Sequence, residues 1–413
     1  MSRSYTTVTA CRVCGCSELK PVLSLGDQFV SDFPDKAHLD SGIKCPIEIV
    51  ACQRCTLVQQ LHTAPQELLY SRHYWYRSGT TATMRAALQD VACSALKAAK
   101  LSDGDTVIDI GSNDGTLLRC FDQPGFPKVH KVGVEPADNL QDEGRAGVDQ
   151  LIHDFWPTDK YRGERAKVIT ALGMFYDLDD PNAFIAGVAQ NLARDGVFIA
   201  QLMCLQNMLA VSDLGNLCHE HLEFYTLRSL MQLYNKHGLV ITDVETNDVN
   251  GQSYRIYAVK DGPMSLEGWL AADGVHRFKA ALDAEHDILD RLSDFVKRMA
   301  ENKRRVVEFV RTEVNLGKRV YAYGASTKGN VVLQYYSLDN SLIAGVAEKD
   351  PQKFGRYTVG SRIPIVPEEM ARQHADYFFV LPYAFKQEFL ERERDWRAKG
   401  GKFLFPLPQM EVV

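Results

Sequence analysis

Residues Val107-Ile108-Asp109-Ile110-Gly111-Ser112-Asn113-Asp114-Gly115 form the most informative stretch of this sequence. An apolar run ends there in Asp-x-Gly, and a second glycine follows four residues after the first. This order predicts a buried parallel strand, a tight turn and the start of a helix. A turn of this kind places backbone N–H groups against a ligand.

The residues after Gly111 separate two cofactor classes that use such a turn. The nicotinamide fingerprint G-x-G-x-x-G needs a glycine two residues after the first, and Ser112 and Asn113 break that pattern. The form D-x-G-x-x-x-G, followed by another strand that ends in an acid, instead resembles motif I of class I S-adenosylmethionine (SAM) methyltransferases. SAM has no pyrophosphate for the turn to hold.

The second acid is present in Lys131-Val132-Gly133-Val134-Glu135-Pro136. The carboxylate of Glu135 would accept hydrogen bonds from both ribose hydroxyls. The alternative interpretation is a structural turn with a solvated Glu135. The expected SAM-binding residues are Asp109, Gly111, Ser112, Asn113, Gly115, Glu135 and Pro136.

The composition is that of a globular chain with several domains. It has 413 residues, 45% of them hydrophobic, enough for roughly two to four domains with cores of their own. The 47 basic and 53 acidic residues give a net charge of −6 with no basic block, which disfavours nucleic acid as a partner. No apolar run has membrane-spanning length and no signal peptide is apparent, so we expect a cytoplasmic protein without a membrane partner.

Two C-x-x-C knuckles near the N-terminus predict a structural metal site. Cys11 and Cys14 form the first knuckle, and Cys52 and Cys55 form the second. Four cytosolic thiols in this arrangement suit tetrahedral zinc better than disulfides, although the spacer exceeds the roughly 15 to 20 residues of an ordinary ribbon. Strands at 21–28 and 45–50 would fill it. Buried or redox-active cysteines are the alternative, and the nearby thiols of Cys16 and Cys45 leave the ligand set ambiguous.

Strands and helices alternate after the opening stretch in the manner of a doubly wound sheet. A helix is expected over 81–100, and further strands over 167–171 and 197–202. An antiparallel pair, 239–245 with 254–259, would close a mostly parallel sheet of seven strands. Ligands should lie beyond the carboxyl ends of these strands. The aromatic and basic segment 70–79 either lies across a cofactor or base, or packs the zinc module onto the next domain.

The segment Cys218-His219-Glu220-His221-Leu222-Glu223-Phe224-Tyr225 concentrates groups that exchange protons near neutral pH. Its histidines are two residues apart, which does not match the i, i+4 pairing of a helical metal site. A general base with an adjacent carboxylate to orient it is the better chemical interpretation. A structural hydrogen-bond network is the alternative.

Together these features resemble the sugar-nucleotide C-methyltransferases of branched-deoxysugar pathways over nearly the whole chain. Members of that family carry an N-terminal zinc module, a SAM-binding core with D-x-G-x-x-x-G, a Glu-His pair after the fifth strand and a C-terminal α/β domain. The resemblance implies methylation at C3 of a nucleotide-linked 4-keto-6-deoxyhexose, with His221 as the base that forms an enolate. The expected domains are 1–68 (zinc-binding), 69–262 (methyltransferase), 263–316 (helical linker) and 317–413 (second Rossmann-like α/β domain).

The sequence departs from the family pattern at two positions. Members have a tyrosine where Cys218 stands and a histidine near Asp177. Tyr176 or Tyr225 would substitute for the missing hydroxyl. The candidate catalytic residues are His221, Glu220, Tyr76 and Tyr225.

The C-terminal segment repeats the strand-turn-helix pattern. Strands are expected from Arg319, at 343–348 with Glu348 at its end, and at 377–381, and Lys328 would meet a phosphate at a helix N-terminus. The glycine spacing is not the dinucleotide fingerprint. This domain either helps enclose the sugar nucleotide, as the resemblance implies, or only packs.

Several alternatives stay open at this point. An O- or N-methyltransferase would keep SAM but use another acceptor, and a zinc-ribbon scaffold would not be an enzyme at all. The sequence does not distinguish a dTDP-linked from a GDP-linked substrate. We expect a monomer or a weak homodimer.

Overall fold

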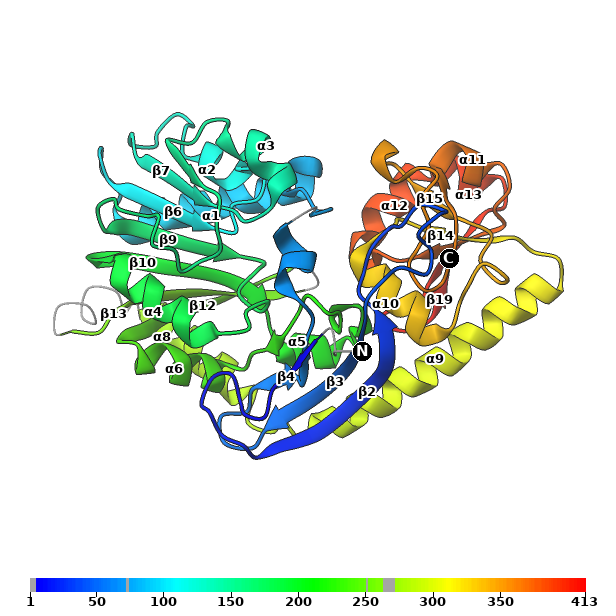
Figure 1. Ribbon diagram of the computed structural model, residues 1–413, viewed down its shortest axis with the longest axis horizontal. Coiled ribbons are helices and arrows are strands. Elements are labelled where there is room, and N and C mark those ends of the chain that lie inside the picture. The colour runs from blue at the N-terminus through cyan, green and yellow to red at the C-terminus, as the bar shows by residue number, and fades with distance from the viewer. Residues whose placement is uncertain (1–4, 72–73, 250–251, 263–271) are drawn as a thin grey trace.

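The computed structural model describes residues 5–71, 74–249, 252–262 and 272–413. Two lobes stand side by side, and the N-terminal strands and helix α9 (Arg291–Asn315) run beneath them from one lobe to the other (Figure 1). Residues 72–73 of the aromatic segment and 266–271 of the predicted linker helix lie outside the described residues.

The first lobe is built on a seven-stranded sheet in the order β12-β13-β10-β9-β6-β7-β8. β6 lies inside it, hydrogen-bonded in parallel to β7 and β9, while β13 runs antiparallel to both β10 and β12. The predicted mostly parallel sheet is confirmed. Its strands are β6 (Thr106–Ile110), β7 (His130–Val134), β8 (Gln150–Ile152), β9 (Ala166–Leu172), β10 (Leu192–Met203), β12 (Leu239–Asn247) and β13 (Ser253–Lys260).

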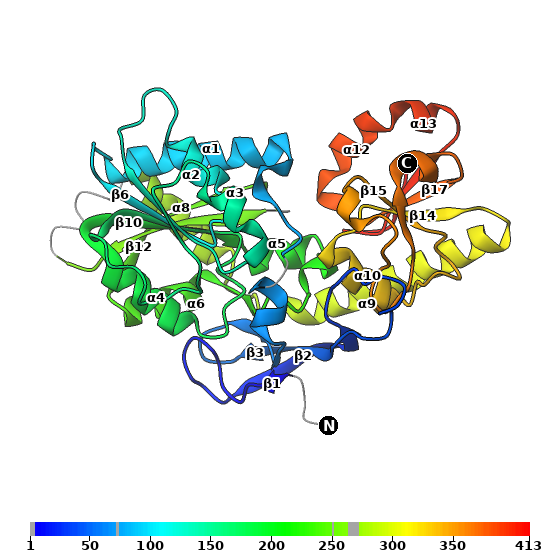
Figure 2. The same ribbon diagram turned by 45° about the horizontal axis from the view of Figure 1, so that its top comes forward.

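Both faces of β6 are buried, which explains its nearly continuous apolar sequence. Val107 packs with helix α1, and Ile108 and Ile110 on the other face share a core with α4 and α6. Figure 2 shows α1 on one side of the sheet and α4 and α6 on the other. The main helices of the lobe are α1 (Ala82–Ala99), α2 (Thr116–Cys120), α3 (Gln141–Arg145), α4 (Pro181–Asn191), α5 (Leu205–Ala210), α6 (Leu227–Lys236) and α8 (Ala272–Asp283).

The N-terminal module contributes a four-stranded antiparallel sheet in the order β11-β4-β3-β2. Its edge strand β11 comes from the first lobe, directly after the predicted base. A second small sheet pairs β1 with β5. The strands are β1 (Thr6–Thr7), β2 (Leu19–Phe29), β3 (Lys44–Cys52), β4 (Val58–Gln60), β5 (His62–Thr63) and β11 (Glu223–Phe224). Two short helices, η1 (Glu67–Ser71) and η2 (Ser78–Thr80), follow β5 along the chain.

The second lobe has a six-stranded sheet in the order β16-β15-β14-β17-β18-β19, parallel except for β19. A Cβ on Gly324, after β14, would lie 2.8 Å from Cγ of Pro382, so the turn there packs closely against that proline. The elements are β14 (Val320–Tyr323), α10 (Thr327–Tyr336), β15 (Val346–Glu348), β16 (Ile365–Pro367), α11 (Glu368–Arg372), β17 (Tyr377–Val380), α12 (Lys386–Arg392), α13 (Arg394–Ala398), β18 (Lys402–Phe405) and β19 (Glu411–Val412).

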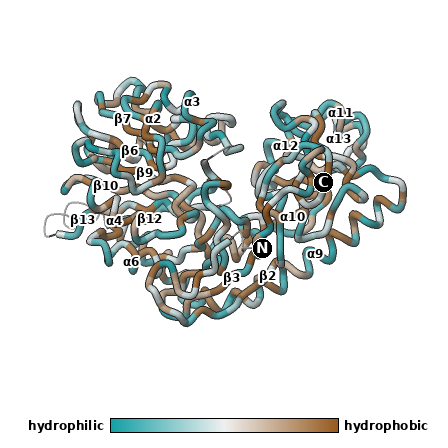
Figure 3. The backbone as a smooth tube through the Cα atoms, in the orientation of Figure 1, coloured by the Kyte–Doolittle hydropathy of each residue, from teal (hydrophilic) through white to brown (hydrophobic). Residues whose placement is uncertain are grey.

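Helix α9 buries one stripe and leaves its charges on the other side. Phe295, Met299, Val306 and Val310 are buried in a core that includes strands of the second lobe, whereas Arg304 stays in solvent. Hydrophobic segments recur throughout both lobes, as the brown parts of the tube show (Figure 3). Among the described helices, none combines the length and the apolar character that crossing a membrane would require.

Candidate active site

The turn after β6 takes the shape that its glycines predict. Gly111 has φ +70°, and its N–H donates to the carbonyl of Val134 on β7 over 2.8 Å. Beneath it, the carboxyl of Asp109 accepts a 2.7 Å hydrogen bond from Thr170, and burial raises the pKa of Asp109 to about 7. Asp109 therefore supports the turn from below and does not line a cavity.

Glu135 faces the turn from the end of β7. Its carboxylate accepts hydrogen bonds from the backbone N–H of Asn113 (2.8 Å) and of Ala137 (2.9 Å), and burial raises its pKa. A cavity of about 330 Å³ opens between these groups. It is lined by Gly111, Asn113, Glu135, Pro136, Phe155, Trp156, Gly173, Met174 and others.

This cavity, here called the turn cavity, fits SAM in size and chemistry. It combines apolar walls with two buried acids, Glu135 and Asp177, which are the features of a small-molecule site. Ser112 and Gly115 do not line it: Ser112 packs over Gly133, and Gly115 begins α2 with φ +76°. Of the expected SAM-binding residues, the structure thus brings four to the cavity, and the other three hold the turn.

Substitution of Gly111 by alanine is expected to weaken SAM binding at least about tenfold. A Cβ there would lie 2.9 Å from Cγ of Met174, and positive φ costs a non-glycine residue about 1–3 kcal/mol. Titration calorimetry with SAM measures the change. Gly104→Ala is the matched control, because Gly104 has φ +89° with nothing within 4 Å. Equal SAM affinity in both variants would contradict this reasoning.

The histidine-rich segment forms a buried loop between η4 (Leu214–Asn216) and β11. The Nδ1 atom of His221 lies 3.0 Å from the carbonyl oxygen of Asn216. A carbonyl only accepts hydrogen bonds, so Nδ1 carries the proton and Nε2 is left with a free lone pair. Burial, assisted by the nearby charge of Lys328, holds the pKa of His221 well below its usual value. His221 is therefore neutral and chemically suited to accept a proton.

Two carboxyl groups lie with His221 on one cavity wall. Oδ1 of Asp177 and Oε2 of Glu220 are both buried without a hydrogen-bond partner among the described residues. Burial raises the pKa of each carboxyl group. The neighbouring charge of Glu220 raises the pKa of Asp177 further, because like charges repel. Burial thus disfavours the charged form of both groups, and both line the same cavity as His221. Burial likewise keeps Cys218, beside Glu220, as a neutral thiol.

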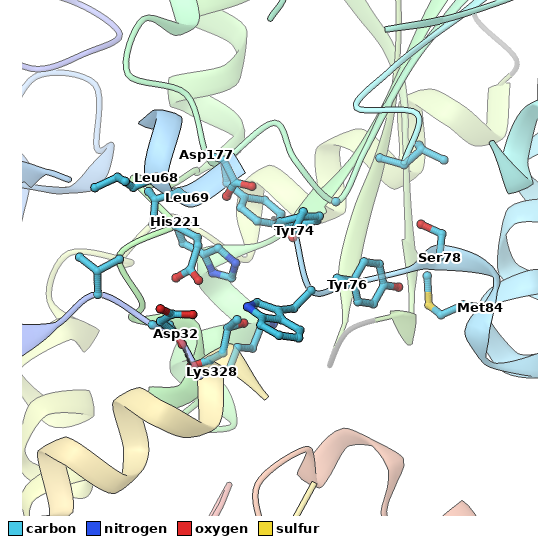
Figure 4. A pocket seen from close by; sticks show the side chains of 18 of the residues that line it. Asp32, Leu68, Leu69, Tyr74, Tyr76, Ser78, Met84, Asp177, His221 and Lys328 are labelled. Atoms are coloured by element: carbon cyan, nitrogen blue, oxygen red, sulfur yellow. Dashed lines mark hydrogen bonds between the residues drawn. The ribbon is translucent and has the colours of Figure 1, made fainter. Parts of the chain in front are cut away.

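A cavity of about 710 Å³, here called the base cavity, gathers side chains from three parts of the chain. Figure 4 shows His221, Asp177 and Tyr74 with Asp32 from the N-terminal module and Lys328 from the second lobe. The Nζ atom of Lys328 donates to Oδ1 of Asn216 over 2.5 Å. The base cavity and the turn cavity share a wall, made by Tyr74, Tyr76, Ser78, Leu172, Gly173 and Asp177.

The aromatic segment lies across this shared wall. Asn113 in the turn binds it on both sides, accepting from the N–H of Ser78 (2.9 Å) and donating to the carbonyl of Tyr76 (3.1 Å). Trp75 meanwhile packs edge-on against Phe33 of the N-terminal module at 5.4 Å. The segment therefore lines both cavities and packs the N-terminal module onto the first lobe, as one of the two interpretations predicts, while its place across a cofactor or base stays a prediction.

Tyr225 does not reach either cavity. Its ring is fully buried and stacked on Phe175 with centroids 5.2 Å apart. The expectation that Tyr225 replaces a catalytic hydroxyl is corrected by this position, because Tyr225 follows β11 and packs its ring into the core beside Phe175, outside both cavities. Tyr176 instead lies edge-on to the His221 ring at 4.6 Å. Glu220, His221 and Tyr76 do line the base cavity.

The four knuckle cysteines come together as a set. Their sulfur atoms all lie within 4.8 Å of one another, with 3.4 Å between Cys11 and Cys55 and 3.6 Å between Cys14 and Cys52. Such spacing matches a tetrahedron of thiolates around zinc, whose Zn–S bonds are about 2.3 Å. Cys16 and Cys45 are outside this set. A closed four-thiolate site of this kind is structural.

Three family models match successive parts of the chain. Residues 11–70 match "Putative zinc binding domain", residues 61–244 match "Methyltransferase domain", and residues 248–408 match "C-methyltransferase C-terminal domain". The four-cysteine cluster lies in the first match, and the turn and His221 lie in the second. The prediction of an enzyme is confirmed, and the alternative of an inert scaffold is wrong.

A curated relative matches along almost the entire chain. The C-methyltransferase NovU of Streptomyces niveus is 29% identical over 98% of this chain and 97% of its own length. Among solved structures, magnesium protoporphyrin IX methyltransferase from Synechocystis, with bound SAM, matches with a TM-score of 0.33 and 12% identity, over 43% of this chain and 79% of its own. A likeness at that TM-score says nothing about the activity of this chain. The chain is a SAM-dependent C-methyltransferase related to NovU, in which the match to a zinc-binding domain precedes the methyltransferase domain and the match to a C-methyltransferase C-terminal domain follows it.

Proposed function

We propose that this enzyme methylates a carbon atom of a nucleotide-linked 4-keto-6-deoxyhexose, at C3, with His221 as the base. The observation that carries the proposal is the shared wall between the turn cavity and the base cavity. A carbon atom placed beside His221 can thus face a methyl donor held by the turn. The sugar class rests on the resemblance of the sequence motifs to sugar-nucleotide C-methyltransferases.

The reaction needs a base because a C–H bond is not itself nucleophilic. Nε2 of His221 removes a proton from the carbon next to the ketone, and the electron pair of that C–H bond moves into an enolate. SAM, when bound, supplies the electrophilic methyl group. The enolate carbon would form the new C–C bond as the methyl–sulfur bond breaks, with that electron pair left on the sulfur of S-adenosylhomocysteine. Glu220 would relay or orient the proton on His221. Glu135 holds the ribose of the cofactor.

Charge that develops on the ketone oxygen requires hydrogen-bond donors in the base cavity. Lys328 offers an ammonium group there, and the protonated carboxyl of Asp177 is a second donor. Arg356 lines the same cavity and adds a second cation suited to a diphosphate. Residues of the N-terminal module and of the second lobe would therefore enclose the nucleotide part of the substrate.

A substrate panel tests the proposal. Enzyme and SAM are incubated in deuterium oxide with dTDP- and GDP-linked 4-keto-6-deoxyhexoses, and products are read by mass spectrometry and NMR. One sugar should gain a methyl group on carbon and exchange a single C–H proton with solvent. Methyl transfer to oxygen or nitrogen, with the C–H proton retained, would replace the proposal by the other acceptor class. Binding of SAM without methylation or exchange of any sugar would refute the ketosugar substrate.

Replacing Lys328 by methionine is expected to move the acid limb of the kcat profile to higher pH. Lys328 lowers the pKa of His221, so its removal lets that pKa rise towards the ordinary value and the base becomes protonated at a higher pH. We expect a shift of up to about one pH unit, measured as methyl transfer across pH 5–8. Lys349→Met removes an exposed lysine of the same lobe and should leave the profile unchanged. A limb that stays in place or moves to lower pH would contradict this role.

A further inference from the structure

The loop that holds His221 is built partly by the N-terminal module. Strand β11, which begins two residues after His221, pairs with β4, so that Glu223 lies opposite Gln59 and Phe224 opposite Val58. β4 itself begins three residues after the last knuckle cysteine, Cys55. The catalytic loop is therefore continuous, through one sheet, with the zinc-binding cysteines.

Gln60 at the end of β4 makes the closest connection. Its side chain is fully buried, and its Nε2 donates to the carbonyl oxygens of Cys218 (2.5 Å) and of His221 (2.8 Å). Its backbone N–H donates to the carbonyl oxygen of Leu222 over 2.9 Å. Three N–H donors of one residue thus hold three carbonyls within the five residues 218–222, and one of those carbonyls belongs to His221 itself.

The knuckle supports Gln60 from behind. Arg12, which lies between Cys11 and Cys14, donates from a guanidinium nitrogen to the carbonyl of Gln60 over 2.6 Å. The same guanidinium lies 3.7 Å from the fully buried carboxylate of Glu223 on β11. These contacts are buried from solvent and tie the orientation of Gln60 to the folded knuckle.

We propose that Gln60 is a positioning residue for the base, which makes the zinc module a part of the active site. The inference rests on the proposed role of His221. The two hydrogen bonds of Nε2 fix the backbone on either side of Glu220 and so set the direction of the His221 ring. A base displaced by about 1 Å loses up to about 100-fold in rate, because proton transfer requires close alignment.

Gln60→Met tests this proposal, with Gln59→Met as the matched control. Gln59 is the neighbouring glutamine on the same strand and is equally buried, but its side chain bonds Arg12 and Ala10 of the knuckle and not the catalytic loop. We expect Gln60→Met to lower kcat by about 10- to 100-fold, with the SAM dissociation constant and bound zinc unchanged. Solvent deuterium exchange into the ketosugar should fall in parallel, since both depend on the base. Gln59→Met should keep kcat within about threefold.

Two results would overturn the proposal: a wild-type kcat in Gln60→Met, or an equal fall of kcat in both variants, which would mark a general packing effect. If Gln60→Met binds less zinc, Gln60→Asn replaces it, because that variant keeps a buried amide but withdraws it from the two carbonyls by one methylene. The Asn variant must then show the same fall in kcat with full zinc content. His221→Asn in the same assay separates the two ideas, since wild-type exchange in that variant would refute the base assignment itself.

Discussion

His221→Asn is expected to lower the rate of methyl transfer by about 10²- to 10⁴-fold, the usual contribution of a general base. An asparagine amide can still donate to the carbonyl of Asn216, as Nδ1 of His221 does now. It has no lone pair basic enough to take a proton from carbon. Exchange of substrate hydrogen with deuterium oxide should therefore disappear together with methylation, and SAM affinity should be unchanged because His221 does not line the turn cavity.

His219→Asn is the control for this substitution. His219 belongs to the same loop, but its Nε2 lies 2.9 Å from the carbonyl of Cys45, and it does not line the base cavity. Burial lowers the pKa of His219 to about 4, so it is neutral like His221 and differs from it mainly in position. This variant should retain deuterium exchange. If His219→Asn loses exchange and His221→Asn keeps it, the two histidines have the opposite roles.

The local patterns of the sequence were enough to predict the sheet, because parallel strands carry a strong signal. The run from Val107 to Ile110 has to be apolar when both faces of a strand are buried, and the glycine after it has to accept positive φ. The paired knuckles likewise identify their own partners, since four thiols brought together in this way serve one tetrahedral ion. These features depend on residues that are neighbours in sequence.

The roles of Tyr225 and Gln60 could not be predicted, for a physical reason. Each depends on the pairing of β11 with β4, a contact between residues more than 150 positions apart that leaves no periodic pattern in either segment. That pairing turns Tyr225 into the core against Phe175 and brings Gln60 under the catalytic loop. The sequence predicts Lys328 at a helix N-terminus, and it does lie in the first turn of α10, but its contact with Asn216 beside the base joins two lobes and has no signal in the sequence.

The two departures from the family pattern lie together in the structure. Asp177 lines the base cavity, and the thiol of Cys218 lies beside Glu220, which lines it too. A carboxyl and a thiol occupy less space than a histidine and a tyrosine, and burial keeps both of them neutral. The base cavity therefore offers a carboxyl near the position at which members of the resembling family carry an imidazole, which would change the hydrogen bonds available to the proposed sugar substrate.

Removal of zinc is expected to abolish methylation while SAM binding persists. Structural zinc contributes about 10–16 kcal/mol in zinc-finger peptides, so a Cys52→Ser variant should lose the ion and unfold the knuckle. Arg12 then no longer holds Gln60, and the loop around His221 loses its support. The turn cavity is formed mainly by residues that follow β6, β7 and β9, although Gln66 and Tyr70 from the end of the module also line it, so SAM affinity should fall much less than methyl transfer. Metal content, calorimetric SAM binding and methyl transfer are measured on one preparation.

Cys16→Ser is the matched control for zinc removal. The sulfur of Cys16 is outside the four-thiol set, so this variant should keep the metal and the activity. Full activity in zinc-free Cys52→Ser would mean that the loop holds its shape without the module, and equal metal loss in Cys16→Ser would redraw the ligand set.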